Sequence, residues 1–216
     1  MIQKKVDWQI VILVCSLIII IIMGVRQSLG LFLEPVSQFM KDGKEFFSFA
    51  IGFQAIIWGV VTFGLGILID KFGPQKVLAF GIICFASGIF LMSNPSNQLT
   101  LFSSTSLMGF GLGGAGMATM VSIAGKVAPL EKRSFAMGLI AAAASFGQFV
   151  VVLPTMWMNK AFGWEVSLIV LSIITLLLLL LLPLLNNTNE ENNKKDSFAI
   201  ELQSTLIFSL KERNYI

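Results

Sequence analysis

The chain has 216 residues, of which 56% are hydrophobic and 12% charged, and its mean hydropathy is +0.84. A water-soluble domain has about 25% charged residues and cannot bury so much apolar surface, so this composition excludes a soluble globular enzyme. The formal net charge is +3 and histidine is absent, which excludes zinc sites and catalysis that depend on an imidazole.

Six apolar runs follow one another along the chain, and each is long enough to cross a hydrocarbon core of about 30 Å as a helix. They cover residues 8–33, 46–69, 76–92, 99–121, 134–158 and 163–185. Turn-forming segments separate them: Glu34-Pro35 with residues 41–44, then residues 70–74, 94–97, 129–133 and 159–163. The first run is too long for a cleaved signal peptide. We therefore predict an all-α membrane protein in which residues 1–185 form a bundle of six transmembrane helices.

The basic residues are divided unevenly between alternate loops. Eleven lie on one side of the predicted membrane, namely Lys4, Lys5, Lys71, Lys76, Lys126, Lys132, Arg133, Lys194, Lys195, Lys211 and Arg213. Three lie on the other side, namely Lys41, Lys44 and Lys160. This asymmetry predicts that both termini are cytoplasmic, and we expect the inner membrane of a bacterium. The basic residues form no patch with aromatics, which argues against nucleic-acid binding.

The composition changes abruptly after Leu185, where a run rich in asparagine and charged residues begins. Such a run cannot bury a core, so residues 186–216 are predicted to be a polar cytoplasmic linker. Spaced apolar residues in its last part fit a short helix on the membrane surface.

Polar residues inside the spans are the candidates for function. Arg26 lies about seven residues, or about 10 Å, from the outer end of the first run, and burying its charge there is costly. Two interpretations are open: the side chain snorkels to the interface, or it is a cavity cation that binds a carboxylate. Candidate substrate-binding residues are Arg26, Gln27, Gln54, Thr105 and Gln148. Gln54 and Gln148 either line a cavity or hold helices together.

The first and fourth predicted helices, residues 8–33 and 99–121, are expected to present a different surface from the sixth, residues 163–185. They are called helices 1, 4 and 6 here. Helix 6 contains an uninterrupted leucine run at residues 176–182, which indicates a lipid-facing position. Helix 1 carries Arg26, and helix 4 carries a glycine ladder that includes Gly109 and Gly113, so both are expected to face protein or water. The glycine ladder favours helix packing over binding.

A short repeat with a period of about 90 residues indicates two related units. The loop DKFGP at residues 70–74 resembles NKAFGW at residues 159–164. Because each unit contains three helices, the second must enter the membrane in the opposite orientation. This pattern predicts a 3+3 inverted repeat, which is typical of transporters.

The loop motif adds a family resemblance. GILIDKFGPQK at residues 66–76 resembles the signature that follows the second helix in the major facilitator superfamily, and PLEKRSFAMG at residues 129–138 resembles a second stretch of that family. The Phe72-Gly73-Pro74 variant, residues 30–32 and residues 145–148 are similar to the monocarboxylate transporter and oxalate/formate antiporter branch. The sequence departs from the family at Thr105, Gln75 and Glu165, where basic residues are common.

The resemblance implies half of a twelve-helix fold, with the substrate held between two six-helix halves. It also implies a gate at the cytoplasmic ends of the helices, formed by Gly66, Asp70, Lys71, Gly73, Lys76 and Arg133. In that gate Asp70 would face a helix N-terminus or a basic partner such as Arg133, although a solvated loop charge remains the alternative.

The sequence thus predicts a half-length secondary transporter of a small organic anion, such as a monocarboxylate, that works by alternating access. Its expected partners are the lipid bilayer and a second six-helix half, either a separate chain or a second copy. No cofactor or metal is indicated. The alternative is a truncated remnant or a membrane partner subunit that does not transport. The motifs of intramembrane enzymes are missing, so we expect no enzyme.

Overall fold

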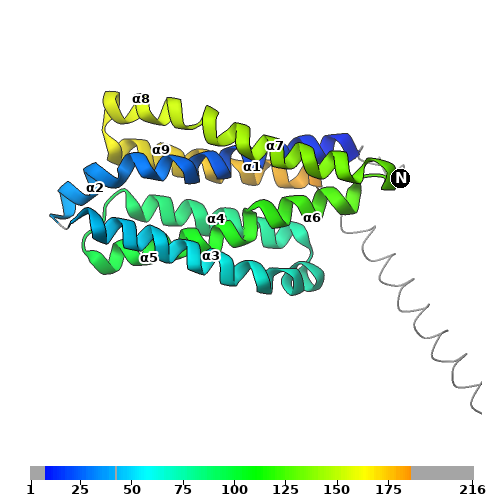
Figure 1. The fold of residues 1–216 in the computed structure, drawn as a ribbon, viewed down its shortest axis with the longest axis horizontal. Coiled ribbons are helices and arrows are strands. Elements are labelled where there is room, and N and C mark those ends of the chain that lie inside the picture. Colours follow the sequence, from blue (N-terminus) through cyan, green and yellow to red (C-terminus); the bar gives the residue numbers. More distant parts are fainter. Residues whose placement is uncertain (1–7, 42, 186–216) are drawn as a thin grey trace, which may run out of the picture.

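The computed structural model describes residues 8–41 and 43–185, apart from the side chains of Leu65, Gly66 and Asp70. This part of the chain is a bundle of helices that run along one common axis (Figure 1). Six stretches are long and apolar enough to cross a membrane, numbered here as spans 1 to 6: Trp8–Met40, Lys44–Gly64, Pro74–Met92, Gln98–Val127, Leu130–Phe162 and Trp164–Leu185. The prediction of an all-α membrane protein with six spans is confirmed. The linker predicted for residues 186–216 lies outside the described residues.

Span 1 is longer than the sequence indicated. It consists of α1 (Trp8–Ser28), the 3-10 turn η1 (Leu29–Phe32) and α2 (Leu33–Met40). The turn predicted at Glu34-Pro35 is wrong, because Pro35 lies in the first turn of α2, where a helix tolerates a missing backbone N–H. The helix ends instead at Lys41, which adopts a left-handed conformation with φ of 58°.

Two glycine turns connect helices at corresponding places in the chain. Helix α3 (Lys44–Phe72) ends at Gly73, with φ of 82°, and α4 (Pro74–Met92) begins at the next residue. Helix α8 (Val152–Phe162) ends at Gly163, with φ of 85°, and α9 (Trp164–Leu177) begins at the next residue. Positive φ values favour glycine, and the two turns lie 90 residues apart. This likeness is consistent with the predicted 3+3 repeat.

Spans 4 to 6 are each built from more than one helical segment. Span 4 consists of α5 (Gln98–Ala115) and α6 (Met117–Val127), which are separated by Gly116. Span 5 contains the 3-10 turn η2 (Leu130–Lys132), α7 (Arg133–Val150) and α8. Span 6 contains α9 and the 3-10 segment η3 (Leu178–Leu185). Span 4 thus extends six residues beyond its predicted end at residue 121.

Small residues let spans 3 and 4 approach each other closely. A Cβ atom added at Gly81 would lie 2.6 Å from the carbonyl carbon of Gly114, and one added at Gly111 would lie 2.5 Å from the Phe85 amide nitrogen. These contacts leave no room for a side chain at either glycine. They support the interpretation that the glycines of span 4 serve helix packing. Ser172 Oγ adds a hydrogen bond of 2.9 Å from α9 to the Ala86 carbonyl of α4.

The remaining close contacts pair span 1 with span 5 and span 4 with span 2. A Cβ atom at Gly147 would lie 2.6 Å from Ile20 Cα, and one at Gly109 would lie 2.8 Å from the Gln54 carbonyl oxygen. A 3+3 repeat relates span 1 to span 4 and span 2 to span 5. It therefore relates the contact between spans 1 and 5 to the contact between spans 4 and 2, so this packing also fits an inverted repeat.

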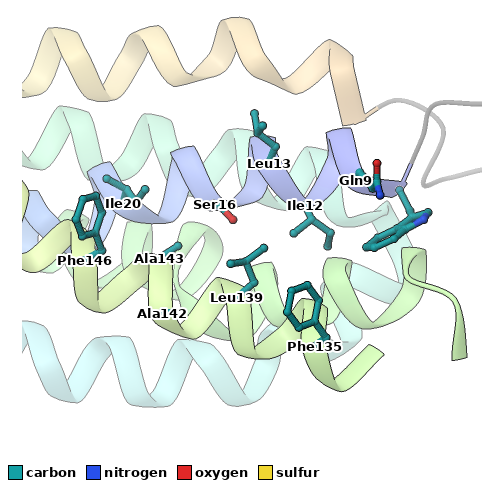
Figure 2. Close-up of a pocket in the computed structure, with 11 residues that line it drawn as sticks. Gln9, Ile12, Leu13, Ser16, Ile20, Phe135, Leu139, Ala142, Ala143 and Phe146 are labelled. Atoms are coloured by element: carbon teal, nitrogen blue, oxygen red, sulfur yellow. The ribbon is translucent and has the colours of Figure 1, made fainter. Parts of the chain in front are cut away.

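The spans differ widely in how much of their surface the bundle covers. In the most apolar 18 residues of each span, 67% of the residues are buried in span 4 but only 17% in span 2. Span 6 exposes Leu176, Leu177 and Leu180, as expected for a lipid-facing helix. Span 5 is also exposed over much of its length, and its α7 helix forms a groove with α1 (Figure 2).

Candidate functional site

Arg26 is held against an aromatic ring of a neighbouring span. It lies in the last turn of α1, and its guanidinium carbon is 4.8 Å from the centroid of the Trp58 ring on α3. The side chain is half-buried, and a cation over an indole face is attracted by the negative charge of the ring face. Within the described ranges no carboxylate forms an ion pair with Arg26. Its charge is therefore positioned but not neutralised.

The position of Arg26 along span 1 is central. The span runs over the 33 residues Trp8–Met40, so its middle residue is Gly24, two positions before Arg26. The 33 residues extend about 50 Å and a hydrocarbon core is about 30 Å thick, so Arg26 lies within the core when the span is centred in the membrane. Its stacking on Trp58 instead directs the guanidinium across the bundle, toward span 2.

The interruption of span 4 lies beside the same tryptophan. Gly116, with φ of −85° and ψ of −166°, breaks the helix between α5 and α6. A Cβ atom added there would lie 3.4 Å from Trp58 Nε1 and would collide with the Leu112 carbonyl oxygen, so the break requires a glycine. The first amides of α6 have no helical acceptors, and the start of a helix carries partial positive charge. Arg26, Trp58 and the break at Gly116 thus form one locus, in which Arg26 supplies the net positive charge because the negative end of α5 adjoins the positive start of α6.

The other candidate substrate-binding residues have different surroundings. Gln54 lies one turn before Trp58 on α3, is 2% exposed, and its Nε2 has no hydrogen-bond partner in the described part of the chain. Thr105 is fully buried, and its hydroxyl donates a hydrogen bond of 3.1 Å to the Phe102 carbonyl of its own helix.

Gln27 and Gln148 are less closely tied to this locus. Gln27 is exposed on α1 next to Arg26, and Gln148 is half-buried on α7. The structure thus brings Arg26 and Trp58 together and places Gln54 one turn from Trp58. Among the described residues neither Gln27 nor Gln148 forms a hydrogen bond with Arg26.

Sequence reasoning missed two residues of the locus. Trp58 lies well inside an apolar span, whereas tryptophan usually marks the membrane interface, and this placement was an available signal. Gly116 was one of several glycines in span 4, and nothing in the sequence distinguished a helix break from a packing position.

The residues of the predicted gate lie near the α3–α4 turn and the start of α7. Gly73 makes the turn, and its amide donates a hydrogen bond of 2.9 Å to the Ile69 carbonyl. Lys71 and Lys76 are exposed. Arg133 is half-buried, and its Nε has no hydrogen-bond partner in the described ranges. The surroundings of Gly66 and the side chain of Asp70 are not described by the structure, so the pairing of Asp70 with Arg133 stays a prediction.

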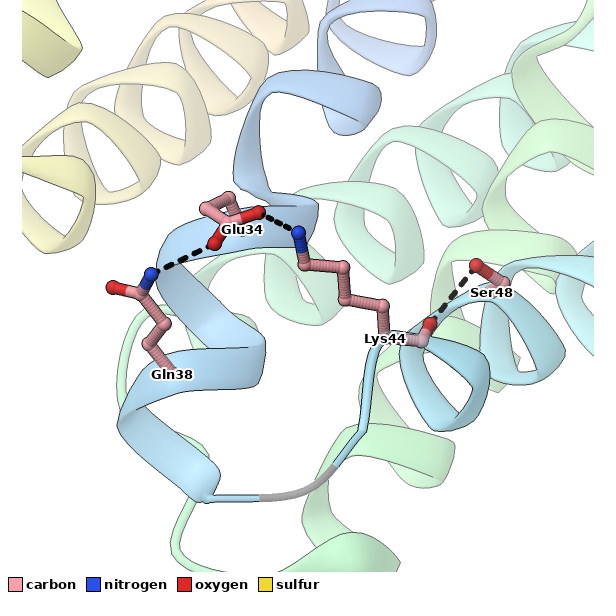
Figure 3. A network of polar contacts seen from close by, with 4 residues as sticks. All are labelled: Glu34, Gln38, Lys44 and Ser48. Carbon is pink, nitrogen blue, oxygen red and sulfur yellow. Dashed lines mark hydrogen bonds and ion pairs between the residues drawn. The ribbon is translucent and has the colours of Figure 1, made fainter.

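A polar cluster at the opposite end of α3 orders the connection between spans 1 and 2 (Figure 3). Glu34 forms an ion pair with Lys44 and accepts a hydrogen bond of 2.7 Å from Gln38 Nε2. Ser48 Oγ donates a hydrogen bond of 3.0 Å to the Lys44 carbonyl. These side chains are exposed and join α2 to the start of α3, so we assign the cluster a structural role.

Comparisons with known proteins agree with this architecture. A family model described as Major Facilitator Superfamily matches residues 8–213. The chain is 26% identical over 118 residues to the Agnestins efflux protein AgnL12 of Paecilomyces divaricatus, covering 53% of this chain and 27% of that protein. It is 25% identical over 155 residues to the uncharacterized MFS-type transporter YcxA of Bacillus subtilis strain 168, covering 69% of this chain and 36% of that protein. The match thus spans about a third of the length of these relatives.

Proposed function

The chain belongs to the Major Facilitator Superfamily, and from this membership we propose that its six helices form one wall of an alternating-access transporter for small organic anions. Proteins of this family are membrane transporters rather than enzymes. The substrate class and the mechanism of coupling are our proposals.

The observation that carries the proposal is the guanidinium of Arg26 near the middle of span 1, which forms no ion pair with any described residue. A charge in this position needs a partner, because an uncompensated ion inside a membrane protein is costly. A guanidinium matches a carboxylate with two parallel hydrogen bonds, and the first amides of α6, which have no helical acceptors, are further donors beside Trp58. In transporters, half-helix N-termini of discontinuous helices point at anionic substrate groups. A small carboxylate between these groups completes the charge balance.

A second six-helix half supplies the other wall in this proposal. It belongs to the same polypeptide, to another chain or to a second copy of this one. The exposed apolar surface of spans 2 and 5, with Phe53, Val60 and Phe149 among its members, provides area for such an association beside Arg26. Exchange of one anion for another requires no proton relay.

The experiment that tests the function is uptake of a labelled small monocarboxylate into proteoliposomes that contain the complete transport unit and are preloaded with the same compound. We expect saturable counterflow that other small carboxylates compete for and that a neutral amide of the same size does not. Equal competition by the amide, or the absence of any carboxylate exchange, would refute the anion proposal.

The gate provides a prediction in the same assay. Asp70→Asn retains the size of the side chain and removes the charge that we propose to interact with a helix terminus or with Arg133. Such interactions contribute about 0.3 to 2 kcal/mol, so turnover is expected to fall about 2- to 30-fold with a smaller change in KM. Glu45→Gln is the matched control, because Glu45 is exposed in the first turn of the same helix. Equal turnover of Asp70→Asn and the wild type would leave Asp70 as a loop charge.

The orientation gives a further prediction. We propose that both termini are cytoplasmic in a bacterial plasma membrane, from the distribution of eleven and three basic residues between the two sides. Single cysteines at Asn97 and Lys160, in a background without Cys15 and Cys84, are expected to react with an impermeant maleimide added to intact cells. A cysteine at Asn192 is expected to react only after lysis, and its labelling in intact cells would reverse the orientation.

A further inference from the structure

An apolar groove runs along the surface between the first half of α1 and α7. Its volume is about 560 Å³. Large side chains from both helices form its walls, and Figure 2 shows them along its length: Ile12, Leu13 and Ile20 from α1, and Phe135, Leu139 and Phe146 from α7. Several of these side chains are exposed, Phe135 to 67% and Leu13 to 59%. The groove is therefore open along the side of the bundle.

The exposed rim of the groove is turned away from Arg26, but its end at Trp8 is not. At about 100° per residue Leu13 and Ile20 lie about 140° and 120° around α1 from Arg26. Trp8 lies on the same face as Arg26, about five turns away. Helix α6 packs against both α1 and α7, so span 4 covers these two helices on another side. We infer that a second half docked over Arg26 and the exposed surface of spans 2 and 5 leaves this side of α1 open to lipid.

Basic side chains lie at one end of the groove. Lys132 Nζ is 5.5 Å from the centroid of the Trp8 ring, and Trp8 is itself part of the groove wall. Arg133 follows at the start of α7, and its Nε lacks a hydrogen-bond partner among the described residues. Tryptophan and lysine are typical of the membrane interface, where lysine and arginine attract anionic headgroups.

The length of the groove fits one leaflet of a bilayer. From Trp8 to Ile20 it follows twelve residues of α1, or about 18 Å at 1.5 Å per residue. Half of a hydrocarbon core of about 30 Å is about 15 Å. A groove that begins at basic interfacial residues and continues as apolar wall to the middle of the membrane has the polarity profile of a phospholipid.

We propose that this groove binds one acyl chain of an anionic phospholipid, whose phosphate lies at Lys132 beside Trp8. In the orientation proposed above the lipid belongs to the cytoplasmic leaflet. The headgroup end of the site is distant from the proposed substrate locus, because Trp8 lies about 27 Å along α1 from Arg26 at 1.5 Å per residue.

The test uses the complete transport unit in nanodiscs that contain phosphatidylglycerol with a photoactivatable diazirine in one acyl chain. After illumination, mass spectrometry locates the lipid adducts on the protein. We expect adducts on the groove-lining peptides of α1 and α7, several-fold more abundant than with phosphatidylcholine that carries the same chain.

Two pairs of variants separate the chain from the headgroup. Ala142→Phe fills the groove from an exposed position in its wall, and Ala55→Phe makes the same change at an exposed position of α3. Lys132→Gln removes the basic group, and Lys160→Gln makes the same change at the other end of span 5. We expect Ala142→Phe and Lys132→Gln to reduce the phosphatidylglycerol adducts several-fold, and the two controls to leave them unchanged.

Each contrary outcome overturns the proposal. Equal amounts of adduct with phosphatidylglycerol and phosphatidylcholine would show that the headgroup is not recognised. Adducts as abundant in Ala142→Phe as in the wild type would show that the acyl chain does not lie in the groove. Lipid adducts on the exposed face of α3 with none in the groove would show that protein, not lipid, covers the groove. None of these results depends on transport, so the lipid site and the transport function can fail separately.

Discussion

Arg26→Gln is expected to reduce carboxylate exchange nearly to background, because the substrate then lacks its proposed ionic partner. Hydrogen bonds to charged groups contribute about 1.5 to 3 kcal/mol, which corresponds to about 10- to 150-fold in affinity. Arg26→Lys retains the charge but loses the planar fork, and it is expected to raise KM about tenfold. Counterflow of a labelled monocarboxylate measures both variants, and protein yield after reconstitution corrects for folding.

The two variants also separate recognition from snorkelling. If Arg26 only reached toward the interface, a lysine in its place would do so equally well and Arg26→Lys would transport normally. Normal transport by both Arg26→Lys and Arg26→Gln would remove the residue-level support for an organic anion. Trp58 supplies a matched check on positioning, because Trp58→Phe retains a ring face for the guanidinium and Trp58→Leu does not. We expect a larger rise in KM for the leucine variant.

Gly81→Leu is expected to destabilise the bundle more than any surface substitution in the same helices. The added Cβ atom would lie 2.5 Å from the Ala115 amide nitrogen and 2.6 Å from the Gly114 carbonyl carbon. These are backbone atoms, which cannot rotate away, so spans 3 and 4 must separate. Overpacking of this kind typically costs about 1 to 3 kcal/mol, and a forced separation of two helices lies at the upper end. The loss of stability is measured by heating the protein in detergent and recording, by size-exclusion chromatography, how much of the folded peak remains at each temperature.

Gly59→Leu is the matched control for this prediction. Gly59 lies on the exposed face of α3, and a Cβ atom added there meets nothing within 4 Å. The control introduces the same side chain into a helix and therefore has the same intrinsic helix propensity. We expect its melting temperature to match that of the wild type. Similar losses in both variants would mean that the close approach of spans 3 and 4 does not limit stability.

Local chemistry made the number and type of the helices predictable. Each span is a run of apolar residues long enough to cross a bilayer, and the backbone inside a membrane has few alternatives to a helix. The turns at Gly73 and Gly163 were equally predictable from the sequence. A glycine at the end of one helix and the start of a new helix within a few residues are both local signals. The candidate cation Arg26 was also visible, since an arginine so far inside an apolar run is rare.

The sequence was less informative where distant spans decide the outcome. It placed a turn at Glu34-Pro35, but α2 continues through these residues and the packing of span 1 extends to Met40. A proline signals a break only when its missing N–H is needed, and that depends on where the helical segment begins.

By itself the sequence determined that the protein is a six-span helical membrane protein, because apolar length and spacing are properties of single segments. Only the tertiary structure decided what surrounds Arg26. Spans 1, 2 and 4 contribute the guanidinium, the Trp58 ring and the Gly116 break, residues that are 32 and 58 positions apart along the chain. Their meeting depends on how closely the helices approach one another. That approach is set by small residues packing against backbone atoms of a neighbouring span, which no single segment encodes.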